Sequence, residues 1–238
     1  MMNKLLVLIT LIIAAITPRI ALAQVRLGLT GGLNLAKLRY EPRDEFAGSP
    51  DENTRASYRI GGIIDIAMSS PFAVQTGVLI MGKGGKSQFG SSSGGYTRTM
   101  SPAYLEIPAD VLFKPNITRG LRLYMGLGPY VAFGIGGKSK YTGNVPAGSF
   151  TDNHRLHFGK QADDDMKKRD IGGNVLAGFE FNSGFLLGVS YGLSFTNNAP
   201  SENLNGPRIL RNKVFGISMG YLFTSYRKWP RHRNYYYY

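Results

Sequence analysis

The sequence predicts an all-β fold: an antiparallel up-and-down transmembrane β-barrel of about eight strands. Three observations lead to this expectation. Apolar residues alternate with small or polar ones over long stretches, long and short connections alternate between those stretches, and an apolar leader precedes them. The 238 residues include 31 glycines, 14 tyrosines and 13 phenylalanines, which favours strands and turns. The absence of cysteine excludes disulfide scaffolds, thiolate metal sites and cysteine nucleophiles.

The first 23 residues have the pattern of a secretory signal peptide. Lys4 gives a charged start, Leu5–Ile16 is apolar apart from one threonine, and Ala21–Ala23 fits a cleavage site. A membrane-anchoring helix is the alternative, but the apolar run is shorter than the roughly 20 residues that a span needs. We therefore expect a signal peptide over 1–23, a barrel over 24–223 and a tail over 224–238.

The remaining chain alternates with a period of two. In Leu121–Ile135 every odd position is apolar, whereas most even positions are glycine, alanine or tyrosine. This period is that of a strand, and lengths of roughly 10–12 residues suit a tilted strand that crosses a bilayer. Eight segments share the pattern: 25–36, 58–68, 72–83, 104–114, 121–135, 171–181, 185–195 and 214–223.

The connections between these segments differ in length in a regular way. Four are long and polar, namely 37–57, 84–98, 138–169 and 196–212, and they alternate with the short connections 69–71, 115–120 and 182–184. Outer-membrane barrels have short periplasmic turns and longer outside loops. We therefore expect both ends of the barrel domain on the periplasmic side.

The direction in which the apolar stripe faces separates two hypotheses. A secreted soluble barrel or sandwich would turn it inward, whereas a membrane barrel turns it toward lipid. The other stripe is mostly Gly, Ser and Ala, which suits a narrow lumen better than a soluble exterior. On the membrane interpretation, charges of both signs face the lumen, and we expect them to form a structural salt-bridge network that fills it. These residues are Arg26, Arg59, Asp65, Lys83, Glu106, Asp110, Arg122 and Glu180.

Several stretches resemble the PorT-like outer-membrane β-barrel family of Bacteroidetes-type bacteria. The most specific is Tyr104-Leu-Glu-Ile-Pro-Ala-Asp-Val-Leu-Phe-Lys114, supported by weaker glycine-rich pieces at 28–38, 126–130, 170–173, 191–195 and 220–223. The resemblance implies a compact barrel in the outer membrane. It also suggests a role accessory to protein secretion, since the namesake member is implicated in export across the outer membrane. It supplies no catalytic residues.

The chain continues past Phe223, where such barrels often stop, into a basic and aromatic tail. Cations beside amphipathic rings suit a membrane interface, so a contact with lipid or a partner protein is one interpretation and a solvated tail is the other. The residues concerned are Arg227, Lys228, Trp229, Arg231 and Arg233.

No catalytic, cofactor-binding or metal site is expected. His154-x-x-His157 and Asp163–Asp165 fall in one long loop, where a metal or acid–base site and a merely solvated loop are both open. We expect a monomeric structural or interaction platform, not an enzyme, in contact with outer-membrane lipid and with envelope or secretion-machinery proteins. Nucleic acid is not an expected partner, despite the formal charge of +13. The alternatives are a rim-located outer-membrane hydrolase and a secreted soluble binding protein.

Overall fold

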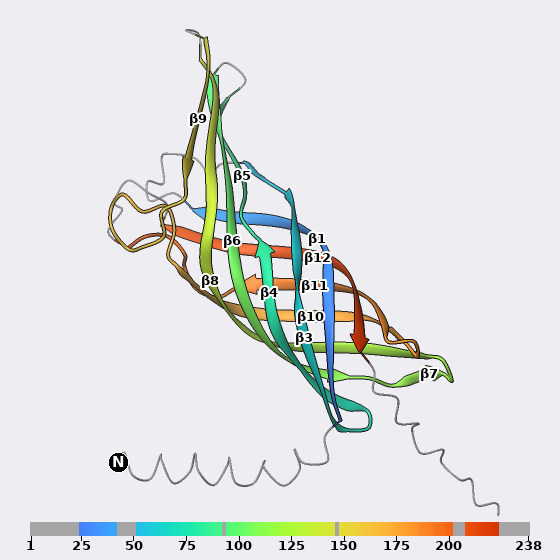
Figure 1. Ribbon diagram of the computed structural model, residues 1–238. Coiled ribbons are helices and arrows are strands. Elements are labelled where there is room, and N and C mark those ends of the chain that lie inside the picture. Colours follow the sequence, from blue (N-terminus) through green and yellow to red (C-terminus); the bar gives the residue numbers. More distant parts are fainter. Residues whose placement is uncertain (1–23, 42–50, 92–93, 146–147, 202–207, 224–238) are drawn as a thin grey trace, which may run out of the picture.

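Eight antiparallel strands close into a barrel (Figure 1). The computed structural model describes residues 24–41, 51–91, 94–145, 148–201 and 208–223. The eight barrel strands are counted within these residues. The predicted signal peptide and tail lie outside them. This architecture confirms the predicted fold class. In ring order the strands are β1 (Gln24–Glu41), β3 (Arg55–Ser69), β4 (Phe72–Gly82), β6 (Gly94–Phe113), β8 (Leu121–Val145), β10 (Arg169–Phe181), β11 (Phe185–Ser194) and β12 (Ile209–Phe223).

The first and last strands seal the ring. β1 pairs with β12 from Leu27↔Phe223 to Glu41↔Ile209, so the two described ends of the domain lie side by side. The short connections gather at that same end, which we call the short-turn end; one of them contains the short strand β7 (Asn116–Thr118). The opposite end is called the long-loop end. Among the described residues no helix is long and apolar enough to cross a membrane.

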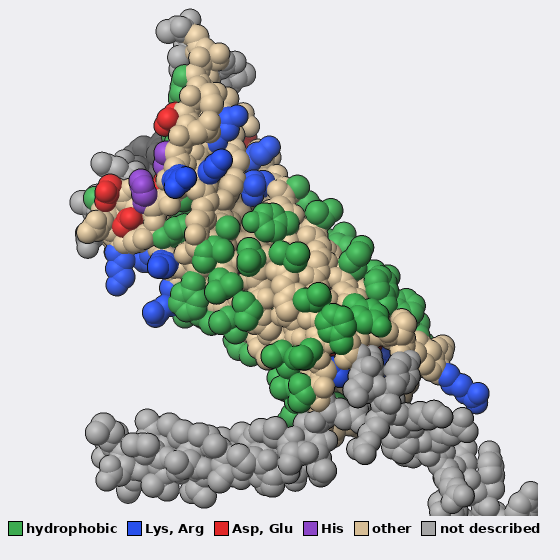
Figure 2. Space-filling model, viewed as in Figure 1, with side chains coloured by type: hydrophobic (Ala, Val, Ile, Leu, Met, Phe, Trp, Pro, Cys, Tyr) green, Lys and Arg blue, Asp and Glu red, His purple; other side chains and the backbone are tan. Residues whose placement is uncertain are grey.

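The apolar stripe faces outward. Leu33 and Leu127 are 71% and 65% exposed, whereas Tyr124, on the other stripe of β8, is 8% exposed. Exposed apolar side chains occur on all eight barrel strands and form an apolar belt, and Figure 2 shows the part of it on the visible face. Such a belt would be unfavourable in water and is what a lipid-facing barrel requires. The inward-facing stripe expected of a soluble barrel or sandwich is not the arrangement found.

The interior is filled by side chains from all around the ring. Small and medium apolar residues form its packed part. Tyr124 of β8 reaches across β10 and donates a hydrogen bond from its hydroxyl to the carbonyl oxygen of Leu187 on β11 at 3.2 Å. An eight-stranded barrel is only wide enough for side chains to fill it. The main apolar cluster consists of Ala36, Ile63, Leu79, Met81, Tyr124, Leu186, Val214 and Leu222.

Two of the connections predicted as loops are largely strands. β5 (Gly85–Ser91) pairs with β6, and β9 (Gly148–Arg155) pairs with β8, while β2 (Asp51–Asn53) adds to the edge of β5. The prediction of loops over 84–98 and 138–169 was therefore wrong in these parts. Apolar periodicity could not detect these strands, because polar residues such as threonine and lysine alternate on their exposed face. The projecting sheet is defined as β2, β5, residues 94–101 of β6, residues 138–145 of β8, and β9.

A β-bulge marks the start of the projecting sheet on β8. Ala103 pairs with Gly136 but Tyr104 pairs with Gly134, so Ile135 is an extra residue on β8. Gly137 has a φ of +153°, and a Cβ there would lie 2.7 Å from the Ser101 carbonyl oxygen, so only glycine fits without strain. An extra residue shifts the side-chain alternation by one. The outward positions on β8 are therefore odd up to Ile135 and even beyond it.

Candidate functional site

Among the described residues, charged side chains of both signs face the barrel lumen in equal number. Five are cations (Arg26, Arg59, Lys83, Lys114 and Arg122) and five are carboxylates (Asp65, Glu106, Asp110, Asp170 and Glu180). All eight residues expected at the lumen lie there. The structure divides them into two ionic networks and a polar middle section.

The first network lies at the short-turn end and joins five strands or strand ends. Arg26 bridges two carboxylates: its Nη2 lies 2.6 Å from Asp65 Oδ1 and its Nη1 lies 2.5 Å from Glu180 Oε1. Lys114 Nζ also contacts both carboxylates, and Arg122 Nη2 lies 3.2 Å from Glu180 Oε1. Three cations thus surround two buried carboxylates, which satisfies the acidic oxygens where water has little access.

The second network lies toward the long-loop end and is centred on Lys83. Its Nζ lies 2.8 Å from Glu106 Oε2 and 3.1 Å from Asp170 Oδ2, and all three side chains are at most 2% exposed. The ring of Tyr130 lies beneath the ammonium, 4.0 Å from Nζ to its centroid. The ammonium is therefore enclosed by two carboxylates and an aromatic face.

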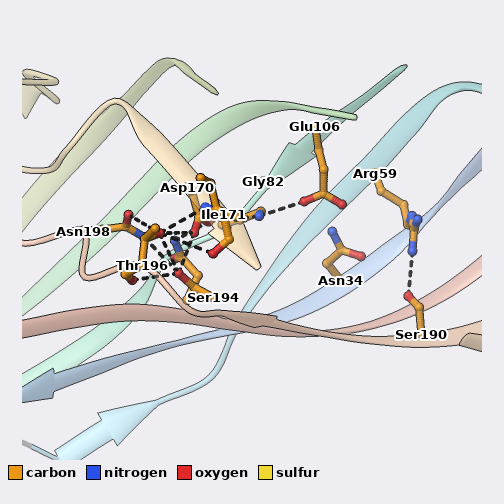
Figure 3. A network of polar contacts seen from close by, with 12 residues as sticks. Asn34, Arg59, Gly82, Glu106, Asp170, Ile171, Ser190, Ser194, Thr196 and Asn198 are labelled. Atoms are coloured by element: carbon orange, nitrogen blue, oxygen red, sulfur yellow. Dashed lines mark hydrogen bonds and ion pairs between the residues drawn. The ribbon is translucent and has the colours of Figure 1, made fainter. Parts of the chain in front are cut away.

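Asp170 is also held by neutral donors. Ser194 Oγ donates to Asp170 Oδ1 at 2.5 Å, and Asn212 Nδ2 donates to Oδ2 at 3.3 Å. Figure 3 shows Ser194, Thr196 and Asn198 converging on this carboxylate from one side, with Glu106 on the other. The network thereby ties β10, β11 and β12 to β4 and β6.

The middle of the lumen is polar, and only some of its described polar atoms have hydrogen-bond partners. Arg59 Nη1 donates to Ser190 Oγ at 2.6 Å (Figure 3), whereas Arg59 Nε and Asp110 Oδ1 have no hydrogen-bond partner among the described residues. A cavity of about 60 Å³ lies here, lined by Arg59, Asp110, Tyr124 and Ser190 among others. It has room for a few water molecules, which are the usual partners of such buried polar atoms.

Two members of the networks are absent from the set derived from the sequence: Lys114 and Asp170. Both have the lumen-facing parity of their strands, since Lys114 follows Glu106 and Asp110, and Asp170 precedes Glu180, by even numbers of residues. Lys114 is the last residue of the predicted segment 104–114, and Asp170 lies one residue before the segment 171–181. Following the alternation to the end of the first segment and one residue beyond the start of the second would have identified them.

A separate cluster lies in the loop between β9 and β10. Asp165 accepts hydrogen bonds from Arg98 Nη2 at 2.6 Å and from the His157 backbone N–H at 3.0 Å, and His154 Nε2 lies 3.2 Å from its Oδ1. Burial raises the pKa of the Tyr141 hydroxyl above its ordinary value, and the Arg98 charge beside that ring acts against the rise. Arg98, on the projecting sheet, forms an ion pair with Asp165 in the loop, so this cluster fastens the loop to the sheet.

The two histidines and three aspartates of this loop do not converge on one point. Asp164 accepts the Gln161 backbone N–H at 2.7 Å, away from Asp165. Within the described part of the chain, no group of three or more His, Asp or Glu side chains is arranged to hold a metal ion. The tail residues Arg227, Lys228, Trp229, Arg231 and Arg233 lie outside the described residues, and their predicted contact with lipid or a partner stays a prediction.

The family comparison agrees with this geometry. The model described as "Outer membrane protein beta-barrel domain" matches residues 19–199. The chain belongs to this outer-membrane β-barrel family. The barrel is accordingly a protein of the outer membrane, and its apolar belt faces outer-membrane lipid. Barrels of this kind usually have their short turns on the periplasmic side.

The chain is similar to several solved outer-membrane proteins at low sequence identity. OprG from Pseudomonas aeruginosa is 13% identical with a TM-score of 0.45, covering 85% of this chain and 96% of that one. Ail of Yersinia pestis is 13% identical with a TM-score of 0.38, covering 84% and 99%. Neisserial surface protein A is 8% identical with a TM-score of 0.39, covering 82% and 96%. No curated protein sequence matches the chain.

Proposed function

We propose that the protein is a surface platform: the barrel anchors it in the outer membrane, the lumen is closed, and the projecting sheet presents a binding surface outside the cell. The observation that carries this proposal is the continuation of β6 and β8 past the apolar belt. Among the β8 residues whose side chains are described, Ile135 is the last strongly exposed apolar one, yet the strand runs on to Val145 as a paired strand. Ordered sheet held above a membrane is suited to recognition rather than to membrane insertion.

The closed lumen supports a platform over a channel. Ionic networks occupy both ends of the lumen, and the cavity between them measures only about 60 Å³. A conducting path needs continuous water, whereas barrels of eight strands are filled by side chains. The lumen charges are therefore proposed to have a structural role, holding the barrel shut.

Planar-bilayer recording tests the closed lumen. The protein is refolded, checked for a heat-dependent shift in gel mobility, and added to bilayers beside a channel-forming barrel as the positive control. The proposal predicts no steady conductance above the lipid baseline. A steady ohmic conductance that rises with the amount of folded protein would contradict it.

A role accessory to protein secretion is a narrower hypothesis that rests on the resemblance to PorT-like barrels. In that case the platform would contact export machinery or other envelope proteins. Deleting the gene and measuring secreted proteins in the medium tests this role. Unchanged secretion, with outer-membrane composition also unchanged, would remove it and leave the platform proposal intact.

A rim hydrolase is the second candidate, favoured by the approach of His154 to the Asp165 carboxylate. The charge of that carboxylate is already shared with Arg98, which makes it a weaker partner for a catalytic imidazole. Variants His154→Ala and His157→Ala test the idea in a screen of peptide and lipid ester substrates. If the wild-type protein has no turnover, or if both variants retain all of it, the hydrolase hypothesis is removed.

A further inference from the structure

The two faces of the projecting sheet differ in chemistry. The inner face carries Phe89, Tyr96, Tyr141 and His154, and Tyr40 of β1 packs against Phe89. These five rings follow one another across the strands with neighbouring centroids 4.8–6.1 Å apart. The outer face continues the outside of the barrel. It carries four exposed cations, namely Lys86, Lys138, Lys140 and Arg155. The bulge at Ile135 places Lys138 and Lys140 on this outer face, because it reverses the alternation of β8.

The outer cations form a regular lattice. Lys138 lies directly opposite Arg155, while Lys86, Thr99, Lys140 and Asn153 form one row across β5, β6, β8 and β9. Neighbouring strands are about 4.8 Å apart and every second residue about 6.7 Å apart, so the Cα atoms of successive cationic residues lie roughly 5–10 Å apart. Figure 2 shows Lys and Arg side chains grouped on the exposed face of this projection.

This cationic lattice lacks compensating carboxylates. None of the four cations forms an ion pair within the described residues; Asp51, opposite Gln88 at the edge, is the acidic residue on that face. Like charges directly opposite one another destabilise a sheet. Like-charged pairs between β1 and β12, by contrast, have acidic partners. Lys37 lies 3.5 Å from Glu52, and Arg39 lies 2.5 Å from Glu41. The Lys138–Arg155 pair therefore retains positive potential that an external anion can neutralise.

We propose that this outer face binds a linear anionic polysaccharide outside the cell, with the cations contacting its sulfate or carboxylate groups. This inference rests on the proposed function, since it names the partner of the platform. The rest of the face is hydrophilic, with exposed hydroxyl and amide groups such as those of Thr142, Thr151 and Asn153, which suit the hydroxyls of a sugar chain. Its described residues include no large apolar or aromatic anchor of the kind that dominates protein–protein interfaces.

The position of the face favours a polymer over the phosphates of membrane lipids. Lys140 lies five residues beyond Ile135, and Thr142 lies seven residues beyond it, which is roughly 16 and 23 Å along the strand. A headgroup at the edge of the apolar belt can reach Lys138 and Arg155, but a chain extending away from the membrane is needed to span the full lattice.

Binding of the detergent-solubilised full-length protein to dextran sulfate, with uncharged dextran as the matched probe, tests the proposal. Wild-type protein should bind dextran sulfate alone, more weakly as salt rises. The variant Lys138→Gln/Lys140→Gln/Arg155→Gln should bind about tenfold or more weakly, because three of four cations are lost. The control Lys160→Gln/Lys168→Gln/Arg169→Gln removes the same charges from exposed positions outside the lattice and should bind like wild type.

Several results would overturn the proposal. Equal losses in both variants would mean that net charge alone drives binding. Folded wild-type protein that fails to bind would exclude the polysaccharide while leaving the platform intact. If the lattice variant lost binding to anionic lipid vesicles but bound dextran sulfate like wild type, the lattice would be assigned to the membrane surface. Inaccessibility of the projecting sheet on intact cells would instead refute the proposed function itself.

Discussion

Replacement of Lys83 by methionine is the most direct test of the lumen networks. Lys83 is 1% exposed, and its ammonium lies 2.8 Å from Glu106 and 3.1 Å from Asp170. Methionine keeps an unbranched chain of similar length but leaves both carboxylates buried without their cation. Removing one member of a buried ion pair costs about 3–5 kcal/mol, because an uncompensated charge remains. We expect Lys83→Met to lower the free energy of unfolding by about this amount.

The assay is equilibrium unfolding in urea of protein refolded in lipid vesicles, followed by far-UV circular dichroism and by the heat-dependent gel shift. For a slope of about 2 kcal/mol per molar urea, a loss of about 4 kcal/mol moves the midpoint by about 2 M. Lys140→Met, on an exposed cation of the projecting sheet, is the matched control and should change stability by less than about 0.5 kcal/mol.

A neutral version of the network separates charge burial from simple loss of packing. The triple variant Lys83→Met/Glu106→Gln/Asp170→Asn removes the cation and both carboxylate charges. Most of the stability lost in Lys83→Met should therefore return. This variant also covers the case in which Lys83→Met fails to fold at all. A Lys83→Met protein within about 1 kcal/mol of wild type, or a triple variant no better than the single one, would refute the proposed role of the network.

Two further predictions rest on local geometry, and a third rests on the sequence of the tail. A Cβ at Gly128 would lie 2.0 Å from a backbone carbonyl oxygen of β6, so Gly128→Ala should destabilise the barrel by about 1–3 kcal/mol, whereas Gly136→Ala, with nothing within 4 Å, should be nearly neutral in the same urea assay. Asp165→Asn should weaken the contacts that fasten the loop before β10 and speed tryptic cleavage after Lys160; unchanged cleavage would show that the loop is held by other contacts. Truncation after Phe223 should reduce co-sedimentation of amphipol-held protein with anionic vesicles, and equal sedimentation would leave the tail as a solvated segment.

The barrel itself could be predicted because two-residue alternation is a direct consequence of strand geometry. Leu127 and Tyr124 belong to opposite stripes in the sequence and to opposite faces in the structure. The direction of the stripes could also be inferred, since a lumen stripe of glycine and serine is a poor exterior. The charged residues of that stripe could be predicted to face the lumen from the same alternation, as the ion pair of Arg26 and Glu180 illustrates.

The projecting sheet could not be predicted from apolar periodicity. Its strands alternate between aromatic or small residues on one face and Lys or Thr on the other. The alternation of apolar with small residues that marks the barrel strands therefore stops where the lipid belt ends. The bulge at Ile135 reverses parity there, and nothing in the sequence other than two adjacent glycines indicates it. The pairing of Lys83 with Asp170, 87 residues apart, depends on the closed ring and is likewise invisible along the chain.

Cysteine labelling on intact cells tests the central claim most directly, and the natural absence of cysteine makes single substitutions clean probes. Lys140→Cys places a thiol on the projecting sheet, and Arg119→Cys places one in a short turn at the opposite end. A membrane-impermeant maleimide should modify Lys140→Cys on intact cells and Arg119→Cys only after the outer membrane is permeabilised. Equal labelling of both on intact cells, or the reverse order, would contradict a barrel that holds this sheet outside the cell.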